Sequence, residues 1–555
     1  MEYITNSTEL TAVADAIRSK GGTSDSLSFP AGFVSAIENI PTGGSPSVKN
    51  LVFIDYDGSE VSSYTTQEAL ALTALPANPS HTGLTAQGWN WSLANIKSYL
   101  TDYPNAIVYV GQMYITSDGK TRIYVTFNDP AALSPYLAVA VNGTISVDWG
   151  DNSTPDTITG ESDITIVFCQ HTYGSTGSYI ITITVSSGYF EFRGESSYAS
   201  CLTVSSSSNN DRRAKIYSNA ITKVNIGSNA RVGIHSFRYC SSLKSITIPD
   251  SVTNIGSYSF VECFSLESMT IPDGVTDING YMLQKCYSIK SISISDSVTS
   301  IWDYAFEYCY ALKSIAIPEG VTTIGDYVLG YCTSLKSVFT PDSVTSLGVT
   351  VFSGCTSLES VTLGRTSSIK NGLFGQCRSL KSLTIPSSVT SIGSSALSDC
   401  CSLKSITIPS GVTSIDGYAF SGCSALESVT IEDGVASIGG SAFSSCFSLK
   451  SVDIPDSVTS IGYSAFSECH SLASFTVPDS VTNISGRVFG FCYGMKECHI
   501  KPTTPPTLGT AAFTGVPSNA IIYVPYSADH SILENYQTAS GWSTYASQIQ
   551  EEPAP

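Results

Sequence analysis

Apolar and polar positions follow one fixed order from about residue 221 to residue 500, and this order repeats every 23 residues. Within a unit two apolar positions, such as Ile406 and Ile408, are two residues apart, which is typical of a half-buried strand. Proline, which has no N–H to donate, then ends that strand. The inward positions of one unit are Leu403, Ile406, Ile408, Val412, Ile415 and Phe420. A single unit cannot bury these side chains, so the pattern predicts a solenoid of about twelve stacked coils.

Cysteine occupies the same position in every unit. A residue type that recurs once per coil at a fixed position is expected to have a packing role, and a free thiol packs as a small hydrophobe. Stacked cysteines would also come close enough to pair, so disulfides between coils are the alternative. The twelve residues are Cys240, Cys263, Cys286, Cys309, Cys332, Cys355, Cys377, Cys400, Cys423, Cys446, Cys469 and Cys492.

One coil departs from the pattern. The step from Cys355 to Cys377 is 22 residues, and Leu363-Gly364-Arg365-Thr366 replaces the usual Ile-Pro-Asp. The strand-ending proline is lost and an arginine takes the acidic position. We therefore expect a local break in the curvature of the solenoid at this coil.

The repeat unit IGxxAFxxCxSLKSITIPDSVTSIG resembles the BspA-like leucine-rich repeats of bacterial surface antigens and adhesins. The resemblance implies a mainly β fold with a leucine-rich-repeat solenoid over residues 201–500. The segment from Pro505 to Ala546 resembles the closing unit of the same family. We therefore expect residues 501–555 to form a C-terminal cap that covers the apolar end of the last coil.

Two further domains are expected before the solenoid. The runs Val147-Asp148-Trp149-Gly150-Asp151 and His171-Thr172-Tyr173 resemble a PKD-type, immunoglobulin-like sandwich, which we place over residues 127–200. The start of residues 45–126, Val52-Phe53-Ile54-Asp55-Tyr56-Asp57-Gly58, resembles a small β-grasp-like domain of bacterial surface proteins. Asp55 and Asp57 are interpreted as residues of a hairpin turn rather than as a metal or phosphotransfer pair.

The first 44 residues are expected to form a helical attachment segment. Their sequence resembles the N-terminus of tail proteins from phages of Gram-positive gut bacteria, and two short helices bury too little surface to be stable alone. The segment therefore needs a partner, either other phage tail proteins or copies of itself in a homo-oligomer. Packing on the next domain is the alternative. The apolar residues expected to make the attachment are Leu10, Val13, Ile17, Phe33 and Ile37.

Composition excludes some classes of partner. The formal net charge of −19 disfavours nucleic acid and anionic lipid, both of which attract clustered Lys and Arg. The chain contains no run of 18 apolar residues, so the sequence predicts no segment that inserts into a membrane. The first six residues lack the basic start and apolar core of a secretory signal, so a protein acting outside the cell is expected to arrive by another route.

No motif indicates an enzyme, a metal centre or a cofactor. The six histidines lack metalloprotease spacing, and phosphate-binding glycine loops and nucleophile elbows are missing. Asp148, Asp151 and Asp156 could be read as calcium ligands, but turn chemistry is the preferred interpretation. The acidic residues that follow the repeat prolines are also interpreted as turn residues, and the uniform outward Ser and Thr positions as stacking positions.

Aromatic residues gather around the cysteine position of the first five coils. Tyrosine offers a large contact area with a hydrogen-bonding tip at low entropy cost, which suits the binding of a protein or a glycan. The alternative is a ladder that only stiffens the solenoid. The candidate binding residues are Tyr258, Tyr281, Tyr304, Tyr327, Trp302, Tyr308, Tyr310 and Tyr331.

These observations predict a non-enzymatic receptor-binding protein. Our main hypothesis is a phage tail-associated protein, made in the host cytoplasm and carried on the virion, that contacts a surface protein or polysaccharide of the bacterial host. Unpaired cysteines would suit assembly in a reducing cytoplasm. The alternative is an extracellular, cell-surface leucine-rich-repeat adhesin of a bacterium that binds host proteins or glycans.

Overall fold

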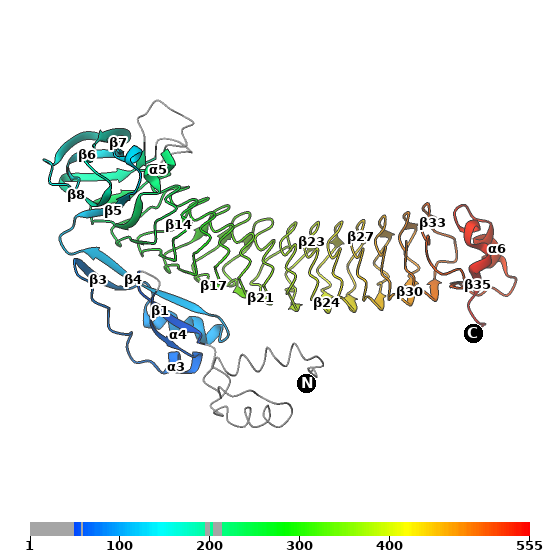
Figure 1. Ribbon diagram of the computed structural model, residues 1–555. Coiled ribbons are helices and arrows are strands. Elements are labelled where there is room, and N and C mark those ends of the chain that lie inside the picture. Colours follow the sequence, from blue (N-terminus) through cyan, green and yellow to red (C-terminus); the bar gives the residue numbers. More distant parts are fainter. Residues whose placement is uncertain (1–48, 57–58, 195–199, 204–213, 555) are drawn as a thin grey trace, which may run out of the picture. The chain divides into compact units, whose positions relative to one another are not determined.

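The computed structural model describes residues 49–554 except for 57–58, 195–199 and 204–213. The predicted attachment residues lie outside the described residues. From Asn50 onward the chain forms one compact unit, in which a small domain, a large sheet and the solenoid follow one another along the sequence (Figure 1). Among the described helices, none has the length and apolarity needed to cross a membrane.

The small domain is a mixed four-stranded sheet with two helices. Its strand order is β2-β1-β4-β3, with β1 and β4 parallel and the other neighbours antiparallel. Phe53 of the sheet and Ile96 and Leu100 of the second helix share one buried cluster. The β-grasp resemblance stays a prediction. The elements are β1 (Leu51–Ile54), β2 (Glu60–Tyr64), α3 (Thr66–Ala71), β3 (Leu84–Trp89), α4 (Leu93–Asp102) and β4 (Val108–Thr116).

The next region contains one connected sheet in the order β12-β10-β5-β8-β6-β7, which includes the first solenoid strand, β12 (Ser245–Thr247). The two-sheet sandwich expected for residues 127–200 is therefore not confirmed. Gly143 and Gly188 face each other where β6 and β8 pair, and a Cβ on either would collide with the opposite backbone. The elements are β5 (Thr121–Phe127), η1 (Pro130–Ala132), β6 (Tyr136–Asp148), β7 (Asp156–Gln170), β8 (Gly177–Phe192), β9 (Leu202–Thr203), α5 (Ala214–Ser218), β10 (Ile221–Asn225) and β11 (Ala230–Val232).

The three aspartates considered as calcium ligands each have a protein partner within this region. Asp148 accepts from the backbone N–H of Gly150 at 2.9 Å. Asp151 lies 2.8 Å from the Nε2 of His171. Asp156 accepts from the indole N–H of Trp149 at 2.7 Å. These contacts support the interpretation of the aspartates as residues that hold the turn.

The solenoid consists of short parallel strands in two rows, and equivalent residues of successive coils pair directly, as Ser405 does with Ser428. The predicted inward residues are buried. The first row comprises β12 (Ser245–Thr247), β13 (Ser268–Thr270), β15 (Ser291–Ser293), β17 (Ser314–Ala316), β19 (Ser337–Phe339), β21 (Ser360–Thr362), β22 (Ser382–Leu383), β24 (Ser405–Ile408), β26 (Ser428–Ile431), β28 (Ser451–Asp453), β30 (Ser474–Val477) and β32 (Glu497–Ile500). The second comprises β14 (Asp277–Ile278), β16 (Ser300–Ile301), β18 (Thr323–Ile324), β20 (Ser346–Leu347), β23 (Ser391–Ile392), β25 (Ser414–Ile415), β27 (Ser437–Ile438), β29 (Ser460–Ile461), β31 (Asn483–Ile484) and β33 (Thr507–Leu508).

The stack is longer than the twelve coils predicted. Strand β10 pairs in parallel with β12 before the first of them, and β34 (Ile521–Val524) pairs in parallel with β32 after the last. About fourteen coils are therefore stacked. The apolar end is covered by α6 (Ser531–Thr538), η2 (Trp542–Gln548) and β35 (Ile549–Glu551), and Tyr536 of α6 and Trp542 of η2 are fully buried.

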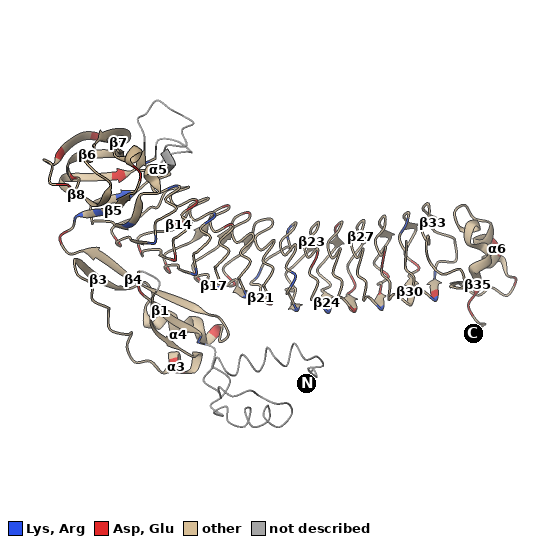
Figure 2. Ribbon diagram, in the orientation of Figure 1, with Lys and Arg blue, Asp and Glu red and all other residues tan. Residues whose placement is uncertain are grey.

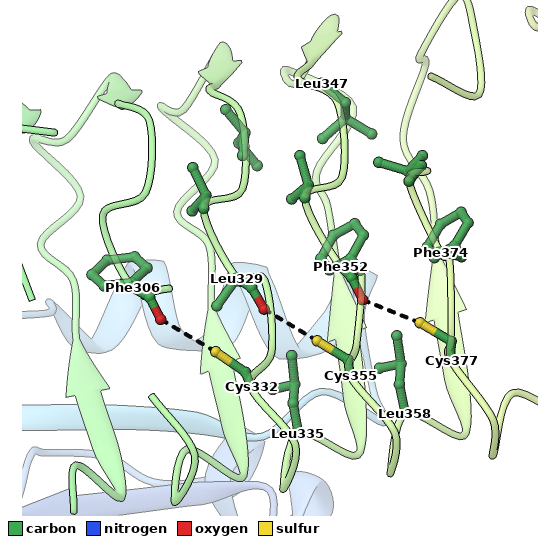
Figure 3. Close-up of a cluster of buried hydrophobic side chains, with 14 of the residues drawn as sticks. Phe306, Leu329, Cys332, Leu335, Leu347, Phe352, Cys355, Leu358, Phe374 and Cys377 are labelled. Carbon is green, nitrogen blue, oxygen red and sulfur yellow. Dashed lines mark hydrogen bonds between the residues drawn. The ribbon is translucent and has the colours of Figure 1, made fainter. Parts of the chain in front are cut away.

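The cysteine column has a hydrogen-bonding role that its periodicity did not reveal. Each buried thiol from Cys263 to Cys492 in this column donates to a backbone carbonyl of the preceding coil, as Figure 3 shows for Cys332, Cys355 and Cys377. The distance from the Cys355 Sγ to the carbonyl oxygen of Leu329 is 3.1 Å. The carbonyl of Leu329 also accepts from the backbone N–H of Cys332 at 3.2 Å, so the thiol is a second, weak donor to the same oxygen.

All sixteen cysteines are free in the structure, and the twelve of the column are buried, as the packing interpretation predicts. Burial raises the pKa of thiols such as Cys263 and Cys309, and a protonated thiol is a poor nucleophile. We therefore expect alkylation of the denatured, unreduced protein to label nearly every cysteine, as read by mass spectrometry. Disulfide-linked peptides from most neighbouring coils would contradict this expectation.

The irregular coil interrupts the second row of strands. Strands β14 to β20 form one sheet and β23 to β33 another, and at the intervening coil Ile369 makes only an isolated bridge to Ile392. Arg365 forms an ion pair with Asp342 of the preceding coil at 3.2 Å. The cysteine column continues through the deletion, because Cys377 still reaches the carbonyl of Phe352. A change of curvature at this coil stays a prediction.

The small domain lies on the strand face of the early coils. Ser293 Oγ donates to the carbonyl of Tyr109 and accepts from the N–H of Gly111, both at 2.9 Å. The indole N–H of Trp91 donates to the carbonyl of Ile294 at 2.6 Å. The equivalent residue of a later coil, Thr407, is exposed. Interpreting the outward Ser and Thr as stacking positions alone was therefore wrong for the early coils, where some of them bind the small domain.

Candidate binding surface

The predicted tyrosines at the first aromatic position form a continuous stack. The ring centroids of Tyr258 and Tyr281 are 4.6 Å apart, those of Tyr281 and Tyr304 4.6 Å, and those of Tyr304 and Tyr327 4.9 Å. The ring planes differ by 13° or less. This spacing follows from the solenoid itself, because strands of neighbouring coils are about 4.8 Å apart. The four side chains therefore form one rigid column, which we call the tyrosine column.

A second column runs beside the cysteines. Phe264, Tyr287 and Tyr310 stack with centroids 4.8 and 4.9 Å apart. Tyr308 and Tyr331 stack at 4.9 Å, and Tyr308 meets Tyr310 edge-on at 6.0 Å, which joins these two groups. Of the predicted binding residues, Trp302 is set apart, because its indole N–H donates to Asp277 at 3.2 Å. It is 47% exposed, more than any of the tyrosines in the prediction.

Stacking decides which part of each ring a partner can reach. The ring faces are covered by neighbouring rings, so the edges and the hydroxyl tips remain for a ligand. Burial and the neighbouring phenols raise the pKa of Tyr281 and Tyr304. Their hydroxyls therefore stay protonated at neutral pH and can both donate and accept hydrogen bonds. The column offers a row of such tips at the interval of the coils.

The backbone of the tyrosine column is in the left-handed region. The φ angle is 60° at Tyr258, Tyr281 and Tyr304 and 56° at Tyr327. A left-handed tyrosine is uncommon and can mark a functional site. Here the same position is left-handed in other coils too, as at Ser395. The conformation is therefore a property of the repeat turn, and only the choice of tyrosine distinguishes the early coils.

Charged side chains are sparse on the described coils of the solenoid, and acidic residues such as Asp250, Asp273 and Glu319 recur after the repeat prolines. Figure 2 shows the charged residues spread sparsely over the coils. Several pair between successive coils, as do Lys381 with Glu359 at 2.7 Å and Lys290 with Glu267 at 2.6 Å. These pairs are largely exposed and therefore contribute little to stability. The aromatic columns are the more distinctive surface feature.

A third aromatic group lies on the later coils and was missed in the sequence. Phe447 and His470 stack at 4.9 Å, and His470 and Tyr493 pack at 5.2 Å. Phe447 is 41% exposed and Tyr493 58%. These residues follow the cysteine, as Phe264, Tyr287 and Tyr310 do, so comparing residue types at that one position would have found them.

Comparison with known protein families identifies the repeats. Residues 212–335, 299–427 and 397–520 match the BspA type leucine rich repeat region, with six copies of the repeat. Together these matches cover more than half of the chain. Among curated proteins the comparison finds no match.

Solved structures with a similar fold include three bacterial proteins. A leucine-rich repeat protein from Bacteroides ovatus is 27% identical, over 60% of this chain and 94% of that one, with a TM-score of 0.40. A leucine rich cell surface protein from Faecalibacterium prausnitzii is 28% identical, over 58% and 93%, with a TM-score of 0.35. The pneumococcal vaccine antigen PcpA is 18% identical, over 52% and 89%, with a TM-score of 0.32.

These TM-scores are all below 0.5, so the assignment rests on the repeats. Their period, their buried positions and their family match agree over the same part of the chain. The chain belongs to the BspA-type leucine-rich-repeat family.

Proposed function

We propose that this protein is a non-enzymatic adhesin of a bacterial cell surface that binds proteins or glycans through its aromatic columns. The stacked tyrosine column is the observation that carries the proposal. Its side chains are held in one geometry before a partner arrives, so binding loses little side-chain entropy. Tyrosine is also among the residues that most often dominate the energy of an interface.

The family supports a surface role. Its leucine-rich repeats resemble those of bacterial surface antigens and adhesins, and a solenoid offers a long, regular surface for contact. If the column only stiffened the solenoid, any aromatic ring would serve at these positions, with or without a hydroxyl. The hydroxyl tips of the column are available in addition, and their row suits a partner with repeated hydrogen-bonding groups.

Adsorption of the purified full chain tests this function. We expect saturable binding of fluorescently labelled protein to host-derived cells, matrix proteins or glycans, read by flow cytometry and by arrays. Protease treatment of the target cells should abolish binding to a protein, and periodate oxidation should abolish binding to a glycan. If the folded protein adsorbs to none of these targets, the proposed function is wrong.

A phage tail-associated, receptor-binding protein is the second candidate. It rests on the resemblance of residues 1–44 to the N-terminus of phage tail proteins, and these residues lie outside the described part of the chain. In that case the partner is a surface protein or polysaccharide of the bacterial host, and other tail proteins hold the N-terminus.

Immuno-electron microscopy separates the two candidates. With antibodies against the solenoid, we expect gold labelling on the surface of intact producing cells. Labelling confined to the tails of purified phage particles would favour the second candidate and would contradict a cell-surface location.

A further inference from the structure

A cavity of about 200 Å³ opens where the small domain meets the strand face of the solenoid. Its walls come from the segment that follows α4 and from strands β17, β19 and β21. Its lining residues include Asp102, Tyr103, Asn105, Ser314, Ser337 and Phe339. The cavity is separate from the aromatic columns, which occupy the turns beside the cysteines.

Ser314 is one of the residues that line this cavity and is its candidate polar contact. The side chain is only 2% exposed. Its hydroxyl oxygen is buried without a hydrogen-bond partner among the described residues. A buried hydroxyl with no partner is destabilising, because it has lost its hydrogen bonds to water. A ligand hydroxyl that reached Ser314 would offset this destabilisation.

The remaining walls combine apolar and neutral polar surface. The rings of Tyr103 and Phe339 pack against each other on one side, together with Ile107 and Val338. Ser337 adds a half-buried hydroxyl from the next coil. No lysine or arginine lines the cavity within the described residues, and Asp102 contributes a carboxylate. An anionic ligand is therefore disfavoured, because nothing in the described lining offsets its negative charge.

We propose that this cavity binds one neutral sugar residue at the end or a branch of a glycan. A sugar ring carries hydroxyls around an edge and C–H groups on its faces, which matches a site of serine hydroxyls and aromatic rings. The volume is smaller than the roughly 300–1,000 Å³ of pockets for drug-sized ligands, so it suits a single ring. The inference rests on the proposed function only for the claim that the protein meets glycans.

Saturation-transfer difference NMR on the purified full chain tests the site. The probes are N-acetylglucosamine, galactose and mannose, with glucose 6-phosphate and N-acetylneuraminic acid as charged comparators. We expect at least one neutral sugar to bind and the charged comparators to bind more weakly. No binding of any neutral sugar, which would mean a cavity filled by water only, or equal binding of the charged sugars, would overturn the proposal.

The Ser314→Ala variant locates the binding within the protein. Removing the hydroxyl should lower the affinity for the sugar by about tenfold, which is the effect of losing one buried hydrogen bond. Its melting temperature should not fall, because the hydroxyl has no protein partner to lose among the described residues. Ser405→Ala is the matched control, since Ser405 occupies the same repeat position on an exposed strand. Unchanged sugar affinity in Ser314→Ala would place the sugar elsewhere.

The two proposals fail separately. If the neutral sugars do not bind but the full chain still adsorbs to cells, the cavity has no such role and the adhesin proposal stands. If a sugar binds at Ser314 and the protein adsorbs to no cell or matrix, the adhesin proposal fails and the sugar site stands.

Discussion

Replacing Leu426 by Ala should lower the free energy of unfolding by about 2–5 kcal/mol, because the deletion leaves a cavity in a close-packed stack. Leu426 is fully buried, and Leu403 and Leu449 occupy the same position in the coils on either side. Strand pairing fixes the distance between these coils, so the cavity cannot close by collapse. Guanidinium titration followed by circular dichroism measures the loss.

Lys404→Ala is the matched control for this prediction. Lys404 is exposed and lies one residue after the buried Leu403. Its replacement should change the free energy of unfolding by no more than about 0.5 kcal/mol, as expected for a surface position. Similar losses in both variants would mean that the inward and outward positions of the repeat do not differ in energy.

Replacing Tyr281, Tyr304 and Tyr327 together by Ser should abolish adsorption to the target surface. The three side chains make up most of the tyrosine column, and interface energy tends to concentrate in such aromatic groups. The fold should tolerate the change, because later coils already carry Ser in the same left-handed conformation, as at Ser395 and Ser441. Adsorption of purified protein to cells is the measurement, with circular dichroism as the folding control.

Tyr418→Ser provides the comparison within the same repeat position. Tyr418 is exposed and left-handed like the tyrosine column but lies in a later coil. Its loss should leave adsorption unchanged. If the folded triple variant adsorbs as well as the original protein, the tyrosine column is only structural. The contact would then lie elsewhere, with the group of Phe447, His470 and Tyr493 as the next candidate.

The solenoid could be predicted from the sequence because its contacts are local and periodic. Each coil packs on the next at a nearly constant separation along the chain, so one 23-residue pattern specifies the strands, the buried positions and the cysteine column. The stacking of Tyr258 on Tyr281 and of Tyr281 on Tyr304 follows from the same period. The period alone therefore indicates that the tyrosines at this position line up from coil to coil.

The sequence pattern was less informative about hydrogen-bond partners and about which strands pair. The period placed Cys355 inside the solenoid but did not show that its thiol reaches the carbonyl of Leu329. The sequence of residues 127–200 indicated strands but not their partners. In the structure β5 joins β8 and β10, so the sheet continues into the solenoid.

The sequence alone determined the repeat, its inward side and the tyrosine column, since these depend on neighbours at a fixed spacing. Only the tertiary structure decided which outward residues of the solenoid remain exposed to solvent. Trp91 meets Ile294 and Asn90 meets Ser293 across about 200 residues, and no periodic pattern records such a contact. Ser314 and Ser405 occupy the same position in the repeat, yet one is buried at a cavity and the other is exposed. The physical reason is that the small domain covers the early coils and not the later ones.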